Sequence, residues 1–486
     1  MNSTNRFLVR FLLPALLTLG SVDAAMAQVA NTRYGTGALV QDTTGDYNSA
    51  FGNYALYSNT AGNDNTAIGV DALFYNQENK NTAIGFQALL ANTYGRYNTA
   101  TGFWALYSNT TGWDNTADGA FALYLNSGDD NTAVGLSALY SNSGFQNTAI
   151  GADALYSNAG SYNTASGFWA LNSNTTGNWN AAFGHYALQS NTGGWWNTAL
   201  GSGALQNNTG GNSNTASGVN ALYSNTTGTW NAAFGSGALY NNTTANDNTA
   251  SGYFALYNST TGGNNTAVGY NALGHVTNGS LNVGLGQYAG YNQTSGSNNI
   301  YIGNQGVNGE SGVIKIGTAT SQTSAYIAGV SGVNITSGAA VMVNSSGQLG
   351  VMSSARRYKE DIRPMGDASE RVYQLRPATF RYKKANERGL KPVQYGLIAE
   401  EVAEVMPELA VYNKDGQPET VAYQVLPTLL LNELQKEHRR VQAQSGEIAD
   451  LKAQVGELRQ LTNQLMALER SHEGTVETAP QAASSR

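Results

Sequence analysis

A serine lies five residues before a lysine where the repetitive part of the chain ends, at Ser354 and Lys359. A hydroxyl beside a neutral amine is the minimum equipment for acyl transfer, because the amine can take the proton that the hydroxyl loses as it attacks a carbonyl. Ser353 stands one residue further from the lysine. The same spacing also fits ordinary polar residues that lead into a folded domain, so the surrounding elements must decide between the two.

Other kinds of chemistry have little support in the 486 residues. The chain has no cysteine, which removes disulfides, thiol catalysis and thiolate metal sites. The four histidines, His185, His275, His438 and His472, are scattered and show no metal-ligand spacing. We therefore expect no metal and no cofactor.

Charge divides the chain into two parts. Residues 28–354 contain four Lys or Arg and twelve Asp or Glu, a net charge of −8, and no cation lies between Arg96 and Lys315. From residue 355 onward the two signs balance at nineteen each. A groove that follows phosphates needs basic side chains. Nucleic acid is therefore not an expected partner.

The N-terminus has the pattern of a secretory signal peptide. Two arginines precede an apolar run from Phe11 to Leu19, and Ala25-Met26-Ala27 offers a small-x-small cleavage site. A single membrane helix is the alternative, but it needs about 20 apolar residues, and Asp23 interrupts this run. We expect export, a mature chain that starts near Gln28, and no integral membrane span after removal of the signal.

From Asn48 the sequence restates one unit, Asn-Thr-Ala-x-Gly-x-x-Ala-Leu, followed by a connection rich in Asn, Thr and Gly. Sixteen copies follow one another at intervals of 16 or 17 residues. Short β-compatible segments such as Thr66-Ala67-Ile68 cannot bury a face alone, so they must stack on copies of themselves. This predicts a mainly β fold, a β-solenoid whose coils pair at about 4.8 Å over a shaft on the order of 70 Å.

The leucine four residues after each glycine, from Leu56 to Leu273, is the predicted core residue. Asn side chains in register are expected to hydrogen-bond along the axis. Because the core of each coil is small, we expect self-association, most simply a homotrimer that shares the leucine seam. The alternative is a disordered low-complexity tract. The unit resembles the head repeats of trimeric autotransporter adhesins, which have a shorter period; this implies left-handed parallel β-rolls with three chains side by side.

All seven tryptophans lie in the repeat region. Trp179, Trp196 and Trp230 stand immediately before a leading Asn, at a predicted corner of the coil. Exposed aromatic rings on a neutral, polar surface could stack on sugars, so a glycan or protein of a host or cell surface is a candidate partner. In the alternative interpretation the rings cap coil edges or lie between chains.

The regular period breaks after Gly303, and residues 313–317 read as a last coil. Beyond it, strands are predicted over 325–330 and 339–343, with a turn at Asn344-Ser345-Ser346-Gly347. These strands would form a small β neck.

A small α+β domain is predicted next. Strands are expected over 376–383 and 393–399, and a short helix over 400–406 that stops at Pro407. Asp415-Gly416 marks a hairpin turn.

A long helix is predicted from Pro427. Apolar side chains recur every seven residues in two seams, which is typical of a coiled coil. The helix alone leaves the number of chains open. The seam residues are Leu434, Val441, Ile448, Val455 and Thr462 in one seam, and Leu451, Leu458 and Leu465 in the other.

The stretch from Ser354 to Ile362, then Leu375-Arg376-Pro377, Tyr395 to Val402 and Met406-Pro407-Glu408-Leu409 resemble the endosialidase-type intramolecular chaperone of phage tail spikes and fibres. The resemblance implies a domain that trimerises, helps to fold the upstream β-structure and then cuts itself off by serine–lysine autoproteolysis.

Carried over from that family, Ser354 would be the nucleophile, Lys359 the base and Arg357 a basic partner, with the cut between Ser353 and Ser354. Burial beside Arg356 and Arg357 would make the lysine easier to deprotonate. The residue after the serine is usually Asp in the family and is Ala355 here.

These observations predict an exported, homotrimeric surface fibre or adhesin-like structural protein, matured by its own C-terminal chaperone. The alternatives are a phage-derived tail fibre, a trimeric fibre whose chaperone stays attached, and a glycan-active enzyme, for which the repeat offers only Asp129-Asp130 as adjacent carboxylates. The expected segments are a signal peptide (1–27), a linker (28–44), the shaft (45–317), the neck (318–353), the chaperone and autoprotease domain (354–424), a coiled-coil helix (425–470) and a disordered tail (471–486).

Overall fold

The computed structural model describes residues 30–318, 321–328, 330, 338–344, 346–386, 388–413 and 415–473. The expected signal peptide and most of the expected tail lie outside these residues. The chain forms two compact units, Met1–Tyr326 and Ile327–Arg486, each of which is described by itself.

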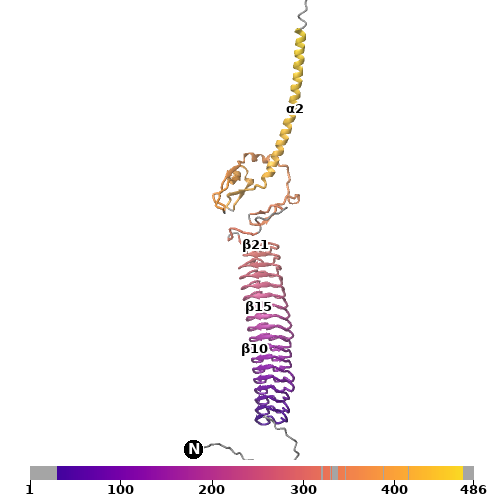
Figure 1. The fold of residues 1–486 in the computed structure, drawn as a ribbon, viewed down its shortest axis with the longest axis vertical. Coiled ribbons are helices and arrows are strands. Elements are labelled where there is room, and N and C mark those ends of the chain that lie inside the picture. Colours follow the sequence, from indigo (N-terminus) through magenta and orange to yellow (C-terminus); the bar gives the residue numbers. More distant parts are fainter. Residues whose placement is uncertain are drawn as a thin grey trace, which may run out of the picture. The chain divides into compact units, whose positions relative to one another are not determined.

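The first unit is a β-solenoid, as predicted (Figure 1). Its main sheet has 18 strands, one per coil, and each strand runs parallel to its neighbours. Pairing joins equivalent residues of successive coils, for example Thr66 with Thr82 and Ala67 with Ala83. The strands are β1 (Thr32–Tyr34), β2 (Ser49–Phe51), β3 (Thr66–Ile68), β4 (Thr82–Ile84), β5 (Thr99–Thr101), β6 (Thr116–Asp118), β8 (Thr132–Val134), β10 (Thr148–Ile150), β12 (Thr164–Ser166), β13 (Ala181–Phe183), β14 (Thr198–Leu200), β15 (Thr215–Ser217), β16 (Ala232–Phe234), β17 (Thr249–Ser251), β18 (Thr266–Val268), β19 (Val283–Leu285), β20 (Ile300–Ile302) and β21 (Ile314–Ile316).

A second, three-stranded parallel sheet forms where three successive coils are shorter by one residue in their connection. Without the extra residue, the backbone after the leucine stays extended long enough to pair. The sheet consists of β7 (Leu125–Asn126), β9 (Ser141–Asn142) and β11 (Ser157–Asn158).

The shaft begins earlier than expected. β1 pairs in register with β2, so the segment predicted as a linker already contains a coil. The leading Asn31 and the glycine four residues later follow the repeat, but Arg33 replaces the usual alanine. Arg33 can stand there because it is exposed in the first coil that the structure describes, and its guanidinium donates to the carbonyl of Leu39 at 3.4 Å.

Alanine and leucine fill the centre of most coils, from β2 to β18 of the main sheet. The middle alanine of each of these strands points inward while its two neighbours point outward, as the two-residue period of a strand requires. Ala100, Ala105 and Leu106 are all 0% exposed, and the equivalent residues of other coils share this burial. The leucines were correctly predicted as core, but they are sealed inside one chain and cannot form the expected seam between chains.

The backbone conformation explains why the leucines point inward. They lie at positive φ, for example +52° at Leu106 and +53° at Leu205. L-residues rarely adopt this left-handed region, so burial of the side chain must offset the strain. This conformation turns the leucine into the coil rather than towards a neighbouring chain.

Two ladders of buried asparagines run along the shaft, of which one was predicted. In the first, Nδ2 of Asn197 donates to Oδ1 of Asn180 at 3.2 Å and to the carbonyl of Gly211 at 2.8 Å. In the second, Nδ2 of Asn208 donates to Oδ1 of Asn191 at 2.8 Å. The ladders satisfy polar groups at the coil corners that would otherwise be buried without partners.

The repeat glycine is required by close packing. Gly85 has a φ of +142°, and a Cβ at this position would lie 2.2 Å from the carbonyl oxygen of Gly102 in the next coil. No side chain can occupy that space without separating the coils.

The second unit contains short paired strands and two α-helices. β22 (Met342–Val343) and β23 (Leu349–Gly350) form a hairpin at the predicted turn. The strand expected over 325–330 is absent from the described residues 325–328, where Tyr326 is 92% exposed and has no partner strand to pair with.

The predicted α+β elements of this unit are present. The strands β24 and β25 pair antiparallel, as do β26 and β27, and α1 ends before Pro407 as expected. The elements are η1 (Arg356–Tyr358), η2 (Gly366–Gln374), β24 (Ala378–Phe380), β25 (Gln394–Gly396), α1 (Ala399–Val405), η3 (Pro407–Leu409), β26 (Ala410–Tyr412), β27 (Pro418–Val421) and α2 (Leu426–Glu473).

Candidate functional site

A single turn of 3₁₀ helix, η1, brings Ser354 and Lys359 together. Within it the N–H of Tyr358 donates to the carbonyl of Ala355, and the N–H of Lys359 to that of Arg356, both at 3.0 Å. The turn folds the chain back between the two residues. As a result, Nζ of Lys359 donates to Oγ of Ser354 at 3.1 Å. This distance is suitable for proton transfer between a nucleophile and a base.

The other two predicted site residues lie apart from this pair. The hydroxyl of Ser353 accepts a hydrogen bond from the N–H of Ala355 at 3.4 Å. The guanidinium of Arg357 lies over the ring of Tyr358, 4.8 Å from its centroid. The lysine is therefore paired with Ser354 rather than Ser353, and the side chain of Arg357 packs on the ring of Tyr358.

The pair is open to solvent in one chain. Ser354 and Lys359 are both exposed, as are Arg356 and Arg357, so the expected burial of the lysine is not provided. Peptide cleavage also needs donors for the carbonyl oxygen and exclusion of bulk water. Among the described residues of one chain, no third side chain hydrogen-bonds to either member. Ser354 and Lys359 therefore form an incomplete site in a single chain.

The sequence that begins at this serine identifies the domain. Residues 354–411 match the family described as chaperone of endosialidase. The match starts at Ser354 itself and ends in β26, and it confirms the resemblance drawn from the sequence. Comparison with curated proteins and with solved structures found no match. We call residues 354–411 the chaperone segment; together with a β-solenoid, it suggests a trimeric, tail-fibre-like protein.

The chaperone segment shares a small hydrophobic core with β27 and the first turns of α2. Six buried side chains form this core, and those from the chaperone segment include members of η2 and α1. A core of this size leaves the domain dependent on other contacts for its stability. The buried members are Val372, Val402, Met406, Leu409, Val421 and Leu429.

A polar cluster, which we call the helix latch, joins α2 to η2. Oγ of Ser369, which is fully buried, donates to Oε1 of Glu433 at 2.5 Å. Nζ of Lys436 lies 3.1 Å from Glu433, 2.9 Å from Asp367 and 3.3 Å from Glu370. The side chain of Glu433 is only 6% exposed. The latch fixes the start of α2 to the chaperone segment.

The latch perturbs the acid–base behaviour of its members. The hydrogen bond from Ser369, supported by Lys436, holds the pKa of the Glu433 carboxyl below its usual value. A hydrogen bond to Lys436 likewise lowers the pKa of Asp367. The hydrogen bond to Asp367, followed by that to Glu433, raises the pKa of Lys436. All three groups therefore favour their charged forms in the folded state.

Beyond the latch, α2 has an unpartnered apolar stripe. Leu434, Ile448, Leu451 and Leu458 are 68%, 52%, 57% and 63% exposed. These residues belong to the two predicted heptad seams. One chain gives them nothing to pack against.

The three corner tryptophans are exposed, but two of them stack in a column. The ring of Trp179 lies parallel to that of Tyr162, with centroids 5.3 Å apart, and stacks on Trp196 at 5.8 Å. Both faces of Trp179 are therefore covered by rings of its own chain. Trp230 has no such ring contact among the described residues and is 64% exposed. Sugar binding at the three tryptophans stays a prediction; the faces of Trp179 lie against rings of its own chain, whereas Trp230 makes no such contact in the described part of the chain.

The adjacent aspartates are part of the coil scaffold. Oδ1 of Asp129 accepts the backbone N–H of Trp113 at 3.0 Å, and Asp130 occupies a left-handed corner at a φ of +57°. Asp129 is thus engaged with the backbone of the preceding coil.

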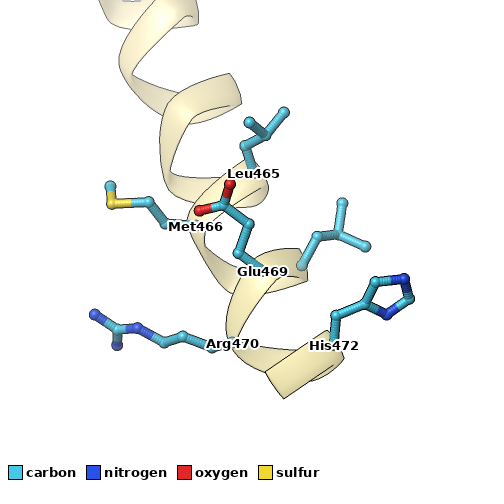
Figure 2. A pocket seen from close by; sticks show the side chains of 6 residues that line it. Leu465, Met466, Glu469, Arg470 and His472 are labelled. Atoms are coloured by element: carbon cyan, nitrogen blue, oxygen red, sulfur yellow. The ribbon is translucent and has the colours of Figure 1, made fainter. Parts of the chain in front are cut away.

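Three other features could mark a functional site: a surface hollow, a cluster of metal ligands and a membrane-spanning helix. An open hollow at the end of α2 is bordered by Leu465, Met466, Glu469, Arg470 and His472, which point away from the helix in different directions (Figure 2). No second wall encloses it, so we assign it no ligand. The described residues contain no group of three or more metal-ligating side chains. Their helices also lack a stretch long and apolar enough to cross a bilayer.

Proposed function

We propose that this protein is an exported, homotrimeric surface fibre or adhesin-like structural protein, and that its C-terminal domain is an intramolecular trimerisation chaperone which cuts itself off before Ser354. The observation that carries the proposal is the 3.1 Å hydrogen bond between Lys359 and Ser354 at the first residue of the chaperone match. Export rests on the signal-like residues 1–27 alone.

The proposed cut is an acyl transfer within the chain. Lys359, once neutral, takes the proton of the Ser354 hydroxyl, and Oγ attacks the carbonyl carbon of Ser353. The bond between that carbon and the nitrogen of Ser354 breaks, and the nitrogen receives the proton from the lysine. The resulting ester is hydrolysed by water, which releases a shaft that ends at Ser353 and a fragment that begins at Ser354.

Trimerisation would complete the site. In one chain Ser354 and Lys359 are both exposed. Burial against neighbouring copies would favour the neutral amine and exclude water. Cleavage is then expected only after assembly, and loss of the domain that assisted folding would make the shaft kinetically stable.

The unpartnered stripe of α2 supports assembly as a coiled coil. Exposed leucines in two heptad seams are stabilised when further helices cover them. Three chains held together by α2 would also begin to fold in register, which reduces the entropic cost of aligning repeats that resemble one another.

A fibre whose chaperone stays attached is the second candidate, and the exposure of the Ser354–Lys359 pair favours it. Expression of the full chain beside Ser354→Ala and Lys359→Ala separates the two. Autoproteolysis predicts a fragment of 133 residues, from Ser354 to Arg486, in the wild type and in neither variant. Ser353→Ala is the matched control and should still be cut, because its hydroxyl contacts Ala355 rather than the lysine.

The oligomeric state of the uncut Ser354→Ala protein tests the proposed trimer. Light scattering should give three chains. An intact wild-type trimer would refute autoproteolysis and retain the chaperone role, whereas a monomer would refute the fibre assembly.

A further inference from the structure

The outer face of the main sheet carries two columns of side chains along the shaft. The strand-end column is formed by the last residue of each strand, and the post-glycine column by the residue two positions later. Both columns point outward, on the side of the sheet away from the alanine core.

Most large members of both columns are apolar and about half exposed; His185 and Gln287 in the post-glycine column are polar. In the strand-end column, Phe183 is 41%, Leu200 53% and Phe234 46% exposed. In the post-glycine column, Phe168 is 41% and Val219 50% exposed. Monomeric proteins rarely leave a continuous apolar stripe of this kind uncovered. The stripe extends over the whole repeat rather than one patch.

In eight of the fourteen coils between Phe51 and Tyr270, one of the two columns has a large side chain and the other a smaller one; in five coils both side chains are large. In some coils the strand-end residue is small and the post-glycine residue large, and in others the order is reversed. Of the coils between Phe51 and Tyr270, only the one with Asp118 and Ala120 has neither residue large and apolar. The first kind comprises Thr101 with Phe103, Ser166 with Phe168, Ser217 with Val219, and Ser251 with Tyr253; the second comprises Phe51 with Asn53, Ile150 with Ala152, Leu200 with Ser202, and Phe234 with Ser236.

Crowding within one chain does not explain the exchange. Ile84 and Phe86 are both large in the same coil, and they are 39% and 40% exposed. One chain thus has room for two large residues. A compensation of volume that the chain itself does not require indicates a surface that packs against the two columns from outside.

We propose that this face is the contact between shafts in the trimer, with the strand-end column of one copy packed against the post-glycine column of the next copy at the same height. The inference rests on the trimer proposed above. In a cyclic trimer the copies have no axial offset, so each coil meets the same coil of its neighbour. In the eight coils of mixed size, a large residue of one column then faces the smaller residue of the other.

A second copy of this chain fits the stripe better than an unrelated partner. Its coils have the same spacing and the same mixture of 16 and 17 residues, so the match persists along the whole length. A stripe about 10 Å wide and about 70 Å long would bury about 700 Å² per copy, near the ~800 Å² per partner of stable interfaces. Asp118 is the one ionised group in the two columns between Phe51 and Asn304, so little charge has to be desolvated.

An exchange of sizes within one coil tests the proposed contact. In the full-length chain we would compare Leu200→Ser, Ser202→Leu and the double variant. Each single change should lower the melting temperature of the assembled shaft by several degrees, the first by leaving a gap and the second by overpacking. The double variant should recover most of the loss, because it reproduces the small–large order of Ser217 and Val219. Additive effects of the two changes would overturn the proposal.

Chemical labelling gives an independent readout, since the chain contains no cysteine. Ser217→Cys places a thiol in the strand-end column, and Ser213→Cys places one at the tryptophan corner; both serines are half-buried in one chain. In the trimer a maleimide should label position 213 at least tenfold faster than position 217. Equal rates in a chain that is trimeric by light scattering would refute this face alone. A monomeric chain would refute the proposed assembly as well.

Discussion

The leucines of the shaft and the leucines of α2 have opposite environments in one chain. Leu106 and Leu205 are 0% exposed, enclosed by the alanines of their own and the neighbouring coil. Leu451 and Leu458, on α2, are 57% and 63% exposed. The shaft therefore completes its core without a partner, and α2 does not.

This difference means that α2 needs partner chains to bury its leucines, whereas the coil core does not. Covering a leucine is worth about 1.5–3 kcal/mol, so full cover of the seven exposed apolar seam residues of α2 would contribute on the order of 10 kcal/mol per chain to association. The two apolar columns of the shaft form a longer surface, whose large side chains are about half exposed in one chain. A removable contact in α2 and a permanent contact along the shaft would suit the proposed chaperone, which assembles the fibre and is then released.

The largest effect is expected from a charge inside the shaft. Asn197→Asp replaces an amide that donates to Asn180 and to the carbonyl of Gly211. The carboxylate would be buried against two acceptor oxygens, with a cost of about 3–5 kcal/mol. Denaturant unfolding of the shaft, read as the free energy of unfolding, should show this loss in any oligomeric state.

Asn212→Asp is the matched control for that change. Asn212 lies outside the ladders, and its Oδ1 accepts the N–H of Trp195 at 2.8 Å, a role that a carboxylate oxygen can fill. This control should be nearly neutral. If both variants lowered the free energy of unfolding by the same amount, the buried ladder would not be a specific source of the stability of the shaft.

A loss of trimers without unfolding of the shaft is expected from charges in the seam of α2. Leu451→Lys with Leu458→Lys places two ammonium groups where helices are proposed to meet. Sedimentation should show monomers, and circular dichroism should still show a folded shaft. Ala453→Lys with Gln460→Lys adds the same charge on the opposite side of the helix and should leave the trimer intact. Dissociation by both pairs would show that net charge, rather than the seam, controls assembly.

The helix latch should make the attachment of α2 sensitive to acid. The pKa of Glu433 is lowered in the folded state, so its contribution to stability is present above the ordinary carboxyl value of about 4.3 and is lost as the pH falls through the lowered value. The protection factors of the amide hydrogens of η2 and of the first turns of α2 should therefore fall below about pH 4.3.

Glu433→Gln tests the origin of that change. The amide keeps an acceptor for Ser369 but loses the charge that faces Lys436. The variant should exchange faster at neutral pH and respond less to acid; the remaining response would come from Asp367, whose pKa is lowered in the same direction. An unchanged acid response would assign the effect to other carboxylates.

Much of the shaft could be predicted because its signals recur in phase. A leading asparagine, a glycine and a leucine at fixed offsets specify stacked coils in register. The first coil was missed because Arg33 stands in place of the alanine, although Asn31 and Gly35 keep the pattern. The second asparagine ladder also had a visible signal, since an asparagine recurs eleven residues after most leading ones, as Asn191 does after Asn180.

The predictions that the structure does not support concern features that depend on backbone conformation or on other chains. The leucine seam was wrong because a positive φ at Leu205 turns the side chain inward, and propensities do not predict that conformation for leucine. The pairing of Ser354 with Lys359 could be predicted from the resemblance to the chaperone family. Their burial was not obtained, because in this proposal it depends on groups that one chain does not contribute.

The smallest effect is expected in a column of stacked tyrosine rings, Tyr107, Tyr124, Tyr140 and Tyr156, which lies outside both the core and the proposed contact. The ring of Tyr140 is stacked between Tyr124, at 5.0 Å, and Tyr156, at 4.8 Å. Tyr140→Asn removes these two stacked contacts, worth about 0.5–1.5 kcal/mol each, yet the fold should persist because Asn172 occupies the equivalent place in its own coil. The melting temperature should fall slightly, with no change in oligomeric state. A loss of trimers would mean that the chains meet at this column rather than at the two apolar columns of the sheet.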